Sequence, residues 1–407
     1  MKKGVKIVLF IILIVILIFG GIFAYHKYEE YKEAERIRNA IIKIDFIEPL
    51  EVEFNEEVRL SDLITSINGT LIDDFKIDTS VVGKKEINFK YINEEDIKVP
   101  YGFILNVVDN TTPVIWLGNS YTVNVGTTKK LEDMIMYGDD YDDNPKCTII
   151  GEYDLNTVGN YNLTMKVEDF SGNVKEKEFT LKVVKPSNSS SSSSNSSKSI
   201  QFSKLYNEYK NDNTLIGIDV SKWQGDIDYE KVKEAGVEFV FIKLGGQNGI
   251  DGEYYIDPKF ERNIEGFKSV DIPVGLYFYS YAKNVKGAKA DALWVVNQIK
   301  DLKIYFPIAF DWENWSKFNS FHVSFNTLTK SAGEFISTLE KHGYKGMLYS
   351  SKSYLEDIWL ENNYTTWLAH YTSQTDYLGE YKCWQRTSLA KIPGITANTV
   401  DFDICYK

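Results

Sequence analysis

Two carboxylates, Asp311 and Glu313, end an apolar and aromatic run that begins at Ile304. If this run forms a strand, its side chains alternate between two faces, so both carboxylates point to the same side. Burying a charged carboxylate among aromatic rings is costly unless the group is paired or protonated. Such surroundings raise the pKa of a carboxyl group and leave a general acid. The alternative interpretation is a solvated strand end that carries two acids by chance.

Two further acids, Asp219 and Asp401, lie in other strand-like runs. Asp219 lies near the end of the run that begins at Leu215, and Asp401 is the second residue of the last run of the chain. If the strands close into a barrel, acids from the first, fourth and last strands converge on one pocket. Glycoside hydrolysis usually needs a pair of carboxyl groups, so this convergence favours a glycosidase.

The elements that would position these acids are short strands alternating with helices. We expect strands at 215–220, 238–244, 272–281, 305–312, 345–350, 366–371, 382–385 and 400–406, and helices at 228–235, 258–268, 285–299 and 327–342. This alternation is typical of a parallel α/β barrel, in which chemistry occurs at the carboxyl ends of the strands. The segment 215–407 is short for a barrel that typically takes about 250 residues. We therefore expect an irregular barrel.

Motifs in a defined order across 215–407 resemble glycoside hydrolase family 25, the muramidase lysozymes. They are Gly217-Ile218-Asp219-Val220-Ser221, Trp223-Gln224-Gly225, Ile227-Asp228, Phe241-Ile242-Lys243-Leu244-Gly245, Asp257-Pro258 with Phe260 and Asn263, Pro273-Val274-Gly275-Leu276-Tyr277, Phe310-Asp311-Trp312-Glu313, Trp367-Leu368-Ala369-His370-Tyr371, Trp384-Gln385 and Val400-Asp401. Each motif alone is weak, whereas their joint order is specific. The resemblance implies an irregular β/α barrel with its acids in a glycan-binding groove.

The resemblance also implies a role for each acid. Glu313 would be the general acid, and Asp311 would orient the N-acetyl group of the substrate as that group attacks the anomeric carbon. Asp219 and Asp401 would tune the protonation of this pair and hold sugar or water. The sugar platforms would be Tyr277, Tyr279, Trp312, Tyr371 and Trp384, with core packing as the alternative for each ring. No cofactor or metal is implied.

Two positions depart from the family pattern. Family members often have Arg where Lys243 stands and an aromatic residue where Arg386 stands. These departures concern contacts with the sugar, whereas the four acids match.

The N-terminus carries the features of a membrane anchor. Lysines precede an almost unbroken apolar run from Ile7 to Tyr25, and a mixed-charge stretch follows from His26 to Arg38. About twenty helical residues cover the roughly 30 Å of a bilayer core. The alternative is a cleaved signal peptide, for which this run is long and ends in a poor cleavage site. We predict a single-pass anchor at 1–25 with a cytoplasmic N-terminus, then a helical stalk at 26–43, with the catalytic part facing the cell wall.

A repeat occupies the middle of the chain. Asp78, Val82, Gly83, Lys90, Phe103, Leu105, Val107 and Val108 recur at one constant spacing as Asp154, Val158, Gly159, Lys166, Phe179, Leu181, Val183 and Val184. Apolar residues alternate with polar ones across this region, which indicates half-buried strands. The sequence therefore predicts two all-β sandwiches, at 44–108 and 109–185. Motifs near Val158 and at Val167 to Asn173 resemble bacterial immunoglobulin-like repeats.

Two polar segments border the barrel. The acidic cluster Asp139, Asp140, Asp142 and Asp143 lacks the ligand spacing of an EF-hand, so a solvated loop is favoured over a calcium site. The run Ser187 to Ser199 is almost pure Ser and Asn, which predicts a flexible linker at 186–214. Such a linker would let the barrel move by roughly 20 Å from the second module.

Composition excludes other classes of function. The net charge of −12 gives no basic surface for nucleic acid. The cysteines, Cys147, Cys383 and Cys405, show no metal or redox spacing, and buried free thiols are favoured over a bridge between the last two.

Together these patterns predict a membrane-anchored peptidoglycan hydrolase. It would cut the β-1,4 bond between N-acetylmuramic acid and N-acetylglucosamine, with peptidoglycan strands and the membrane as partners. The alternative is a non-catalytic scaffold or lectin that binds the cell wall. The oligomeric state is not predicted.

Overall fold

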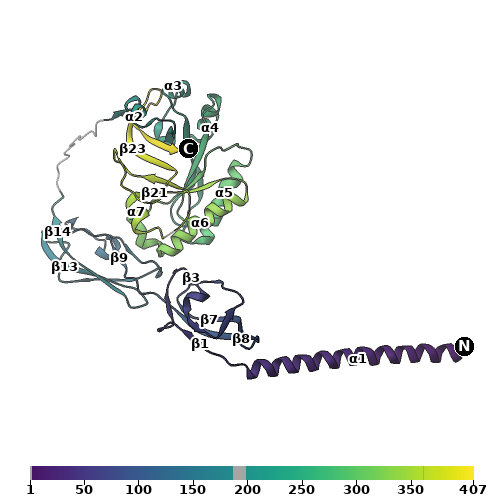
Figure 1. Ribbon diagram of the computed structural model, residues 1–407. Helices are drawn as coiled ribbons and strands as arrows, with labels where there is room; N and C mark the ends of the chain where they lie inside the picture. Colours follow the sequence, from purple (N-terminus) through teal and green to yellow (C-terminus); the bar gives the residue numbers. More distant parts are fainter. Residues whose placement is uncertain (1, 187–198, 361) are drawn as a thin grey trace. The chain divides into compact units, whose positions relative to one another are not determined.

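The computed structural model describes residues 2–186, 199–360 and 362–407, without the side chains of residues 2–13 and 15. The chain divides into two compact units, Met1–Asn110 and Thr111–Lys407. Figure 1 shows the elements of both units.

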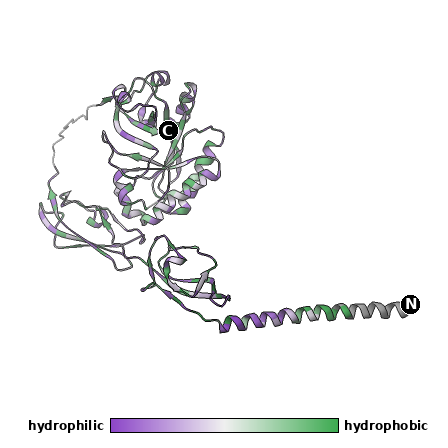
Figure 2. Cartoon of the chain, viewed as in Figure 1, coloured by the Kyte–Doolittle hydropathy of each residue, from purple (hydrophilic) through white to green (hydrophobic). Residues whose placement is uncertain are grey.

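The first unit begins with one long helix, α1 (Lys2–Asn39). The helix runs without a break through the predicted anchor and most of the predicted stalk. Its hydrophilic residues gather toward its C-terminal end (Figure 2). No helix among the described residues is both long and apolar enough to cross a membrane. The predicted anchor covers residues 1–25, and the structure does not describe the side chains of many of these residues.

The rest of the first unit is mostly sheet. Its elements are β1 (Ile44–Phe46), β2 (Glu51–Glu53), β3 (Val58–Arg59), η1 (Leu60–Leu63), β4 (Ile64–Ile67), β5 (Gly69–Leu71), β6 (Lys76–Ile77), β7 (Gly83–Asn93) and β8 (Lys98–Val108). The main sheet has the order β2-β8-β7-β5. Every second side chain of β7 is buried from Ile87 onward, as expected for a strand with one face on a core.

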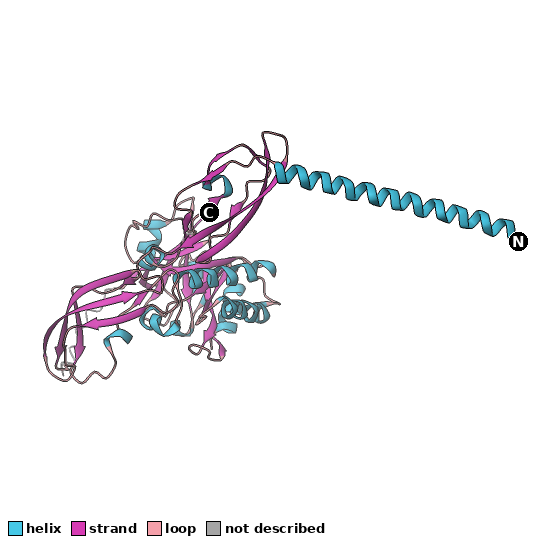
Figure 3. Ribbon diagram, turned by 90° about the horizontal axis from the view of Figure 1, so that it is seen from below, coloured by secondary structure: helices cyan, strands magenta, loops and turns pink. Residues whose placement is uncertain are grey.

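The second unit begins with a module of the same topology. Its elements are β9 (Val114–Ile115), β10 (Ser120–Asn124), η2 (Leu131–Asp133), β11 (Tyr137–Gly138), β12 (Lys146–Ile150), β13 (Gly159–Glu168) and β14 (Val174–Val184). Gly159 pairs with Val183 here, and Gly83 pairs with Val107 in the first unit. The sequence repeat therefore corresponds to one repeated hairpin register. Both modules are built mainly of strands, shown in magenta in Figure 3.

The remainder of the second unit is an irregular barrel. Its strands are β15 (Ile200–Gln201), β16 (Thr214–Val220), β17 (Phe239–Gln247), β18 (Tyr254–Ile256), β19 (Val274–Tyr279), β20 (Ile308–Asp311), β21 (Gly346–Ser351), β22 (Thr366–Ala369), β23 (Cys383–Lys391) and β24 (Val400–Tyr406). Neighbouring strands from β16 to β23 run parallel, apart from β18, which lies off the main path of the sheet and pairs antiparallel with β17. The last strand, β24, closes the ring because it pairs antiparallel with both β16 and β23.

Helices follow the early strands and are absent after the late ones, within the described part of the barrel. They are α2 (Phe202–Tyr209), η3 (Lys222–Gln224), α3 (Tyr229–Glu234), α4 (Phe260–Ser269), α5 (Val285–Ile299), η4 (Trp315–Phe321), α6 (Phe325–Lys341) and α7 (Lys352–Asp357). The domain begins earlier than the predicted position 215. Ile200 pairs with Ala390 of β23, and Phe202 of α2 is buried in the core. The predicted linker is therefore too long at its C-terminal end, and its segment 187–198 lies outside the described residues.

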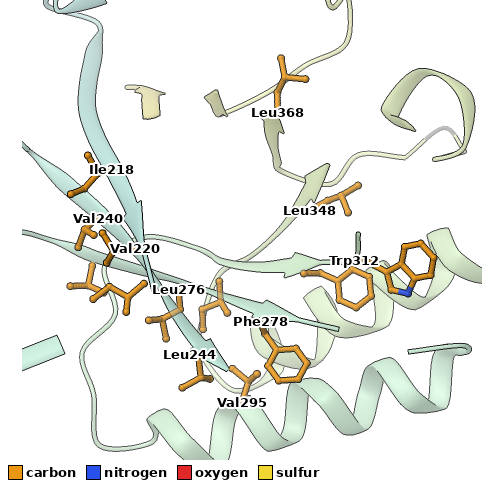
Figure 4. Close-up of a cluster of buried hydrophobic side chains, with 14 of the residues drawn as sticks. Ile218, Val220, Val240, Leu244, Leu276, Phe278, Val295, Trp312, Leu348 and Leu368 are labelled. Atoms are coloured by element: carbon orange, nitrogen blue, oxygen red, sulfur yellow. The ribbon is translucent and has the colours of Figure 1, made fainter. Parts of the chain in front are cut away.

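Alternation along the strands separates two apolar layers. One layer lies between the strands and the helices and includes Ile218, Leu276 and Phe278, and Figure 4 shows Phe278 close to Val295 of α5. The other fills the inside of the barrel with Phe239, Phe241, Ala309, Met347, Tyr349, Trp367, Ala369, Cys383 and Cys405. In β20, Ile308 and Phe310 belong to the outer layer and Ala309 to the inner one. Asp311 therefore continues the inner face.

Two predictions about polar groups were wrong. Cys383 and Cys405, opposite each other on β23 and β24, form a disulfide, whereas free thiols were expected. The acidic cluster is not simply a solvated loop. Asp139 is only 1% exposed, and its Oδ1 accepts hydrogen bonds from the backbone N–H groups of Tyr141 and Asp142.

Candidate active site

The ends of three strands bring four acids together. Asp219 of β16 stands opposite Asp401 of β24 in the antiparallel register. Asp311 ends β20, and Glu313 follows it by two residues. Asp219 and Asp311 are buried, Asp401 is half-buried and Glu313 is exposed. The structure thus brings together all four acids that the sequence singled out: the charge of Glu313 raises the pKa of Asp311 and of Asp401, and the charge of Asp401 raises the pKa of Asp219.

The loop that carries Glu313 is held by its neighbours in the sequence. The Asn314 side-chain amide donates a hydrogen bond to the backbone oxygen of Ser280 over 3.1 Å, just after β19. Trp312 is fully buried in the outer layer (Figure 4), and the alternation of side chains along the strand places it on the opposite face from the two acids. Its indole N–H donates to the backbone oxygen of Ala282 over 3.1 Å. Both anchors fix the backbone on either side of Glu313 and leave its carboxylate directed toward solvent.

The electrostatic surroundings separate Asp311 from Glu313. Burial raises the pKa of Asp311, the negative charge of Glu313 raises it further, and Lys243 lowers it. Burial also raises the pKa of Glu313, while Lys243 and the Tyr349 hydroxyl lower it. Glu313 is exposed yet surrounded by protein on several sides, so it can exchange protons with a bound molecule. Among the described residues, Asp311 Oδ1 is a buried acceptor that has no hydrogen-bond partner.

A fifth acid, Asp403, lies beneath this group and was not among the predicted site residues. Asp403 is fully buried, and its Oδ1 accepts a hydrogen bond from the indole N–H of Trp367 over 2.9 Å. Burial and the charge of Asp401 raise the pKa of Asp403 well above its usual value. Burial and the charges of Asp401 and Asp403 do the same to the pKa of Asp219. Two adjacent buried carboxyl groups are stable when they share a proton.

Gln385 connects this acidic pair to the opening of the site, and the sequence analysis did not assign it a role. Its amide nitrogen donates to Asp219 Oδ2 over 2.8 Å. Its amide oxygen accepts from the hydroxyls of Tyr349 and Tyr371, over 2.8 Å and 2.9 Å. The residue lies on the inner face of β23, between Trp384 and Arg386. Side chains alternate between the two faces of β23, and this alternation was the sequence signal that could have placed Gln385 on the inner face.

Three of the five predicted sugar platforms lie beside the acids. Tyr277 and Tyr279 of β19 are half-buried, and Tyr371 is 57% exposed. Burial and the nearby Asp311 raise the pKa of Tyr279, and burial together with the charges of Asp401 and Asp219 raises the pKa of Tyr371. The ammonium group of Lys243 lies 4.7 Å from the ring centroid of Tyr279. These rings are therefore placed to contact a sugar that reaches the acids.

Trp312 and Trp384 do not fit the role of sugar platform. Trp312 packs edge-on against Trp315 and Phe321 in the outer layer. Trp384 is 4% exposed, and its indole N–H donates to the backbone oxygen of His370 over 2.8 Å. Both belong to the core between strands and helices. Arg386, where the family often has an aromatic residue, donates to the Tyr209 hydroxyl of α2 over 3.0 Å.

A hollow of about 400 Å³ opens beside Glu313, within the usual size range of small-molecule sites. Its lining includes Glu313, Tyr349, Lys352, His370 and Tyr371. The hollow therefore places the Glu313 carboxylate, the exposed ring of Tyr371 and several hydrogen-bonding groups around one space. Such a lining suits a polar ring compound such as a sugar.

Comparisons with known proteins agree on this part of the chain. The model of glycosyl hydrolases family 25 matches residues 218–395. The uncharacterized protein YegX of Escherichia coli (strain K12) is 29% identical over 201 residues, which are 47% of this chain and 69% of YegX. The autolytic lysozyme of Clostridium acetobutylicum is 25% identical over 190 residues, 45% of this chain and 54% of that protein.

A solved structure is also similar. It is the modular autolysin LytC from Streptococcus pneumoniae in complex with a synthetic peptidoglycan ligand, with 24% identity and a TM-score of 0.42. The similarity covers 60% of this chain and 56% of that chain. The chain thus spans little more than half the length of LytC and of the autolytic lysozyme. Residues 218–395 thus match the model of glycosyl hydrolases family 25, and this part of the chain is a glycoside hydrolase.

Proposed function

We propose that this domain is a muramidase, which hydrolyses the β-1,4 bond between N-acetylmuramic acid and N-acetylglucosamine in peptidoglycan. The observation that carries the proposal is that Glu313 lines a sugar-sized hollow and that its charge raises the pKa of the buried Asp311. One acid is buried and the other is open to solvent, which is the asymmetry that divides two carboxyl groups into different roles. The family match and the likeness to the autolytic lysozyme support the same conclusion.

In the proposed mechanism, Glu313 gives its proton to the glycosidic oxygen as that bond breaks. Asp311 accepts a hydrogen bond from the N–H of the substrate's N-acetyl group through its Oδ1, the buried oxygen described above. The N-acetyl carbonyl oxygen attacks the anomeric carbon and forms a cyclic intermediate. Glu313 then takes a proton from water as the water opens the ring, which retains the configuration at the anomeric carbon. Asp219 and Asp401 tune the protonation of Asp311 and Glu313 through their own charges.

We also propose that the chain is tethered to the cell membrane through residues 1–25, with the domain outside the cytoplasm. The apolar run from Ile7 to Tyr25 and the lysines before it support this location. The two β modules, proposed as immunoglobulin-like, would lie between membrane and cell wall. Cell fractionation tests the proposal. The full-length protein should stay in the membrane fraction after a high-salt wash, and recovery of a shortened soluble form would contradict it.

Mass spectrometry of peptidoglycan digests tests the activity. The purified full chain in detergent should release fragments that end in reducing N-acetylmuramic acid. Fragments ending in reducing N-acetylglucosamine would instead assign the other glycosidic bond. Binding to insoluble wall with no soluble product after long incubation would favour the lectin alternative.

A further inference from the structure

The second β module makes specific contacts with the barrel inside the second unit. Both the nitrogen and the oxygen of the Asn319 side-chain amide, in η4, form hydrogen bonds with the module. Its nitrogen donates to the backbone oxygens of Glu132 and Ile135, over 3.0 Å and 2.8 Å. Its oxygen accepts from the backbone N–H of Tyr137 over 3.2 Å. A side-chain amide satisfied by three backbone groups of another module fixes both the distance and the orientation of that module.

The N-terminus of α6 is also bonded to the module. The backbone N–H groups of Phe325 and Asn326 donate to the backbone oxygens of Asp139 and Asp140, over 2.9 Å and 3.1 Å. The first N–H groups of a helix have no partner inside the helix. The Asp143 carboxylate adds a negative charge at this end, where it accepts from the Ser324 N–H over 2.7 Å. Carboxylates are favoured at helix N-termini, so the acidic cluster is complementary to α6.

Apolar groups fill the same contact. The ring of Trp116, from the module, lies edge-on to Phe325 with centroids 5.8 Å apart. Gly138 of β11 lies directly against Phe318 and Phe325, and a Cβ built on it would approach a ring carbon of each to 2.7 Å. Both rings are 3% exposed. The absence of a side chain at position 138 is therefore what allows this close approach.

The segment η4 also contacts the core behind the active site. It begins at Trp315, two residues after Glu313. The ring of Phe318 lies 6.0 Å from that of Trp312, and Phe318 is the residue that meets Gly138 on its other side. Trp315 stacks on Tyr354 of α7 at 3.8 Å between centroids. One short segment thus connects the module to the tryptophan between Asp311 and Glu313.

We propose that the second β module is a docked part of the catalytic unit that positions Glu313 through η4, with Asn319 as the main positioning residue. The flexible attachment expected from the Ser-rich linker does not describe this contact, because hydrogen bonds and rings join the two parts. The catalytic half of the proposal rests on the muramidase function proposed above, whereas the docking half does not.

A pair of glycine variants in the full chain tests both halves. Gly138→Val places a side chain against Phe318 and Phe325. The control, Gly118→Ala, changes a glycine of the same module whose nearest Cβ neighbour, the Ser120 oxygen, is 4.0 Å away. Hydrogen–deuterium exchange should rise in residues 315–321 of the first variant and match the wild-type chain in the control. Equal exchange in both variants would overturn the docking.

Kinetics on peptidoglycan then test the positioning. In Gly138→Val, kcat should fall by about ten-fold or more, since small misplacements of catalytic groups are costly, while KM stays within about two-fold. The basic limb of the pH profile should move to lower pH, because water entering around Glu313 lowers its raised pKa. Raised exchange with an unchanged kcat would overturn the positioning. If the wild-type chain releases no sugar, the proposed function fails, and exchange alone decides the docking.

Asn319→Ala provides a second variant in case Gly138→Val does not fold. It removes three hydrogen bonds to the module and adds no bulk. Its control is Asn297→Ala, on the exposed side of α5. Asn319→Ala should raise exchange at 315–321 and lower kcat, and the control should change neither. Matching behaviour of the two alanine variants would contradict the role of Asn319.

Discussion

The side-chain amide of Gln385 donates to Asp219 over 2.8 Å, although 166 residues separate the two in the sequence. The same side chain accepts from two tyrosine hydroxyls, so it joins the buried acids to the open part of the site. Gln385 is satisfied at both ends of its amide. It therefore fixes the first strand of the barrel relative to the seventh at the level where chemistry is proposed.

Gln385→Leu should destabilise the domain. Leucine has a similar volume but cannot form the hydrogen bonds to Asp219 and the two hydroxyls. Each buried group left unpaired lowers the free energy of unfolding by about 1–3 kcal/mol. Urea denaturation of the full chain, followed by tryptophan fluorescence, measures the change in the free energy of unfolding. Gln374→Leu, at an exposed position, is the matched control. Equal midpoints for the two variants would contradict the role of Gln385.

Glu313→Gln should remove the general acid and keep the fold. We expect kcat to fall by about 10²- to 10⁴-fold, the usual contribution of a positioned acid, with binding to insoluble peptidoglycan retained. Release of reducing sugar and a pull-down on wall fragments measure the two effects. Glu265→Gln makes the same change at an exposed site on α4 and should stay fully active. A Glu313→Gln enzyme as active as this control would refute the assignment.

Lys243→Met should move the pH optimum to higher pH. The positive charge of Lys243 lowers the pKa of both Asp311 and Glu313, so its removal raises both values. The proposed mechanism needs Asp311 ionised and Glu313 protonated. Both limbs of the bell-shaped profile should therefore shift in the alkaline direction. Lys243→Arg keeps the charge and should keep the profile, and an acid shift in the methionine variant would contradict the charge effect.

Asp403→Asn should stabilise the domain as the pH rises. The pKa of Asp403 is raised in the folded state by burial and by Asp401. The folded chain thus binds more protons than the unfolded chain above about pH 4, and its stability falls with rising pH through the folded pKa. Asparagine cannot ionise, so the variant should not lose stability through this group as the pH rises. Its side-chain oxygen can still accept the hydrogen bond from Trp367. Urea midpoints across this pH range, with exposed Asp301→Asn as control, test the expectation. Identical pH dependence in both variants would count against it.

The sequence predicted the barrel and its acids because both follow from local periodicity. Period two in the fourth strand places Asp311 and Glu313 on one face, and the same rule assigns Trp312 to the other. Trp312 was predicted as a sugar platform against that rule, because a strand residue between two acids that share a face points away from both of them. The same reasoning distinguishes Trp384, which faces the helices, from Gln385, which faces the acids.

Other features depend on contacts between distant segments, which periodicity does not encode. The bridge between Cys383 and Cys405 follows from the antiparallel register of β23 and β24. The burial of Asp139 and the docking of the acidic cluster on α6 depend on where two modules meet. A polar loop that binds a helix N-terminus and a solvated polar loop have the same composition, so sequence reasoning cannot separate them.

The closing strand, β24, has a consequence for when hydrolysis can begin. It contributes Asp401 and Asp403, and it is the last of the barrel strands to leave the ribosome. A growing chain that stops before Val400 has an open seam between β16 and β23 and lacks two of its five acids. Neither the closed ring nor the full set of acids in the candidate site is therefore present until β24 has been synthesised and paired.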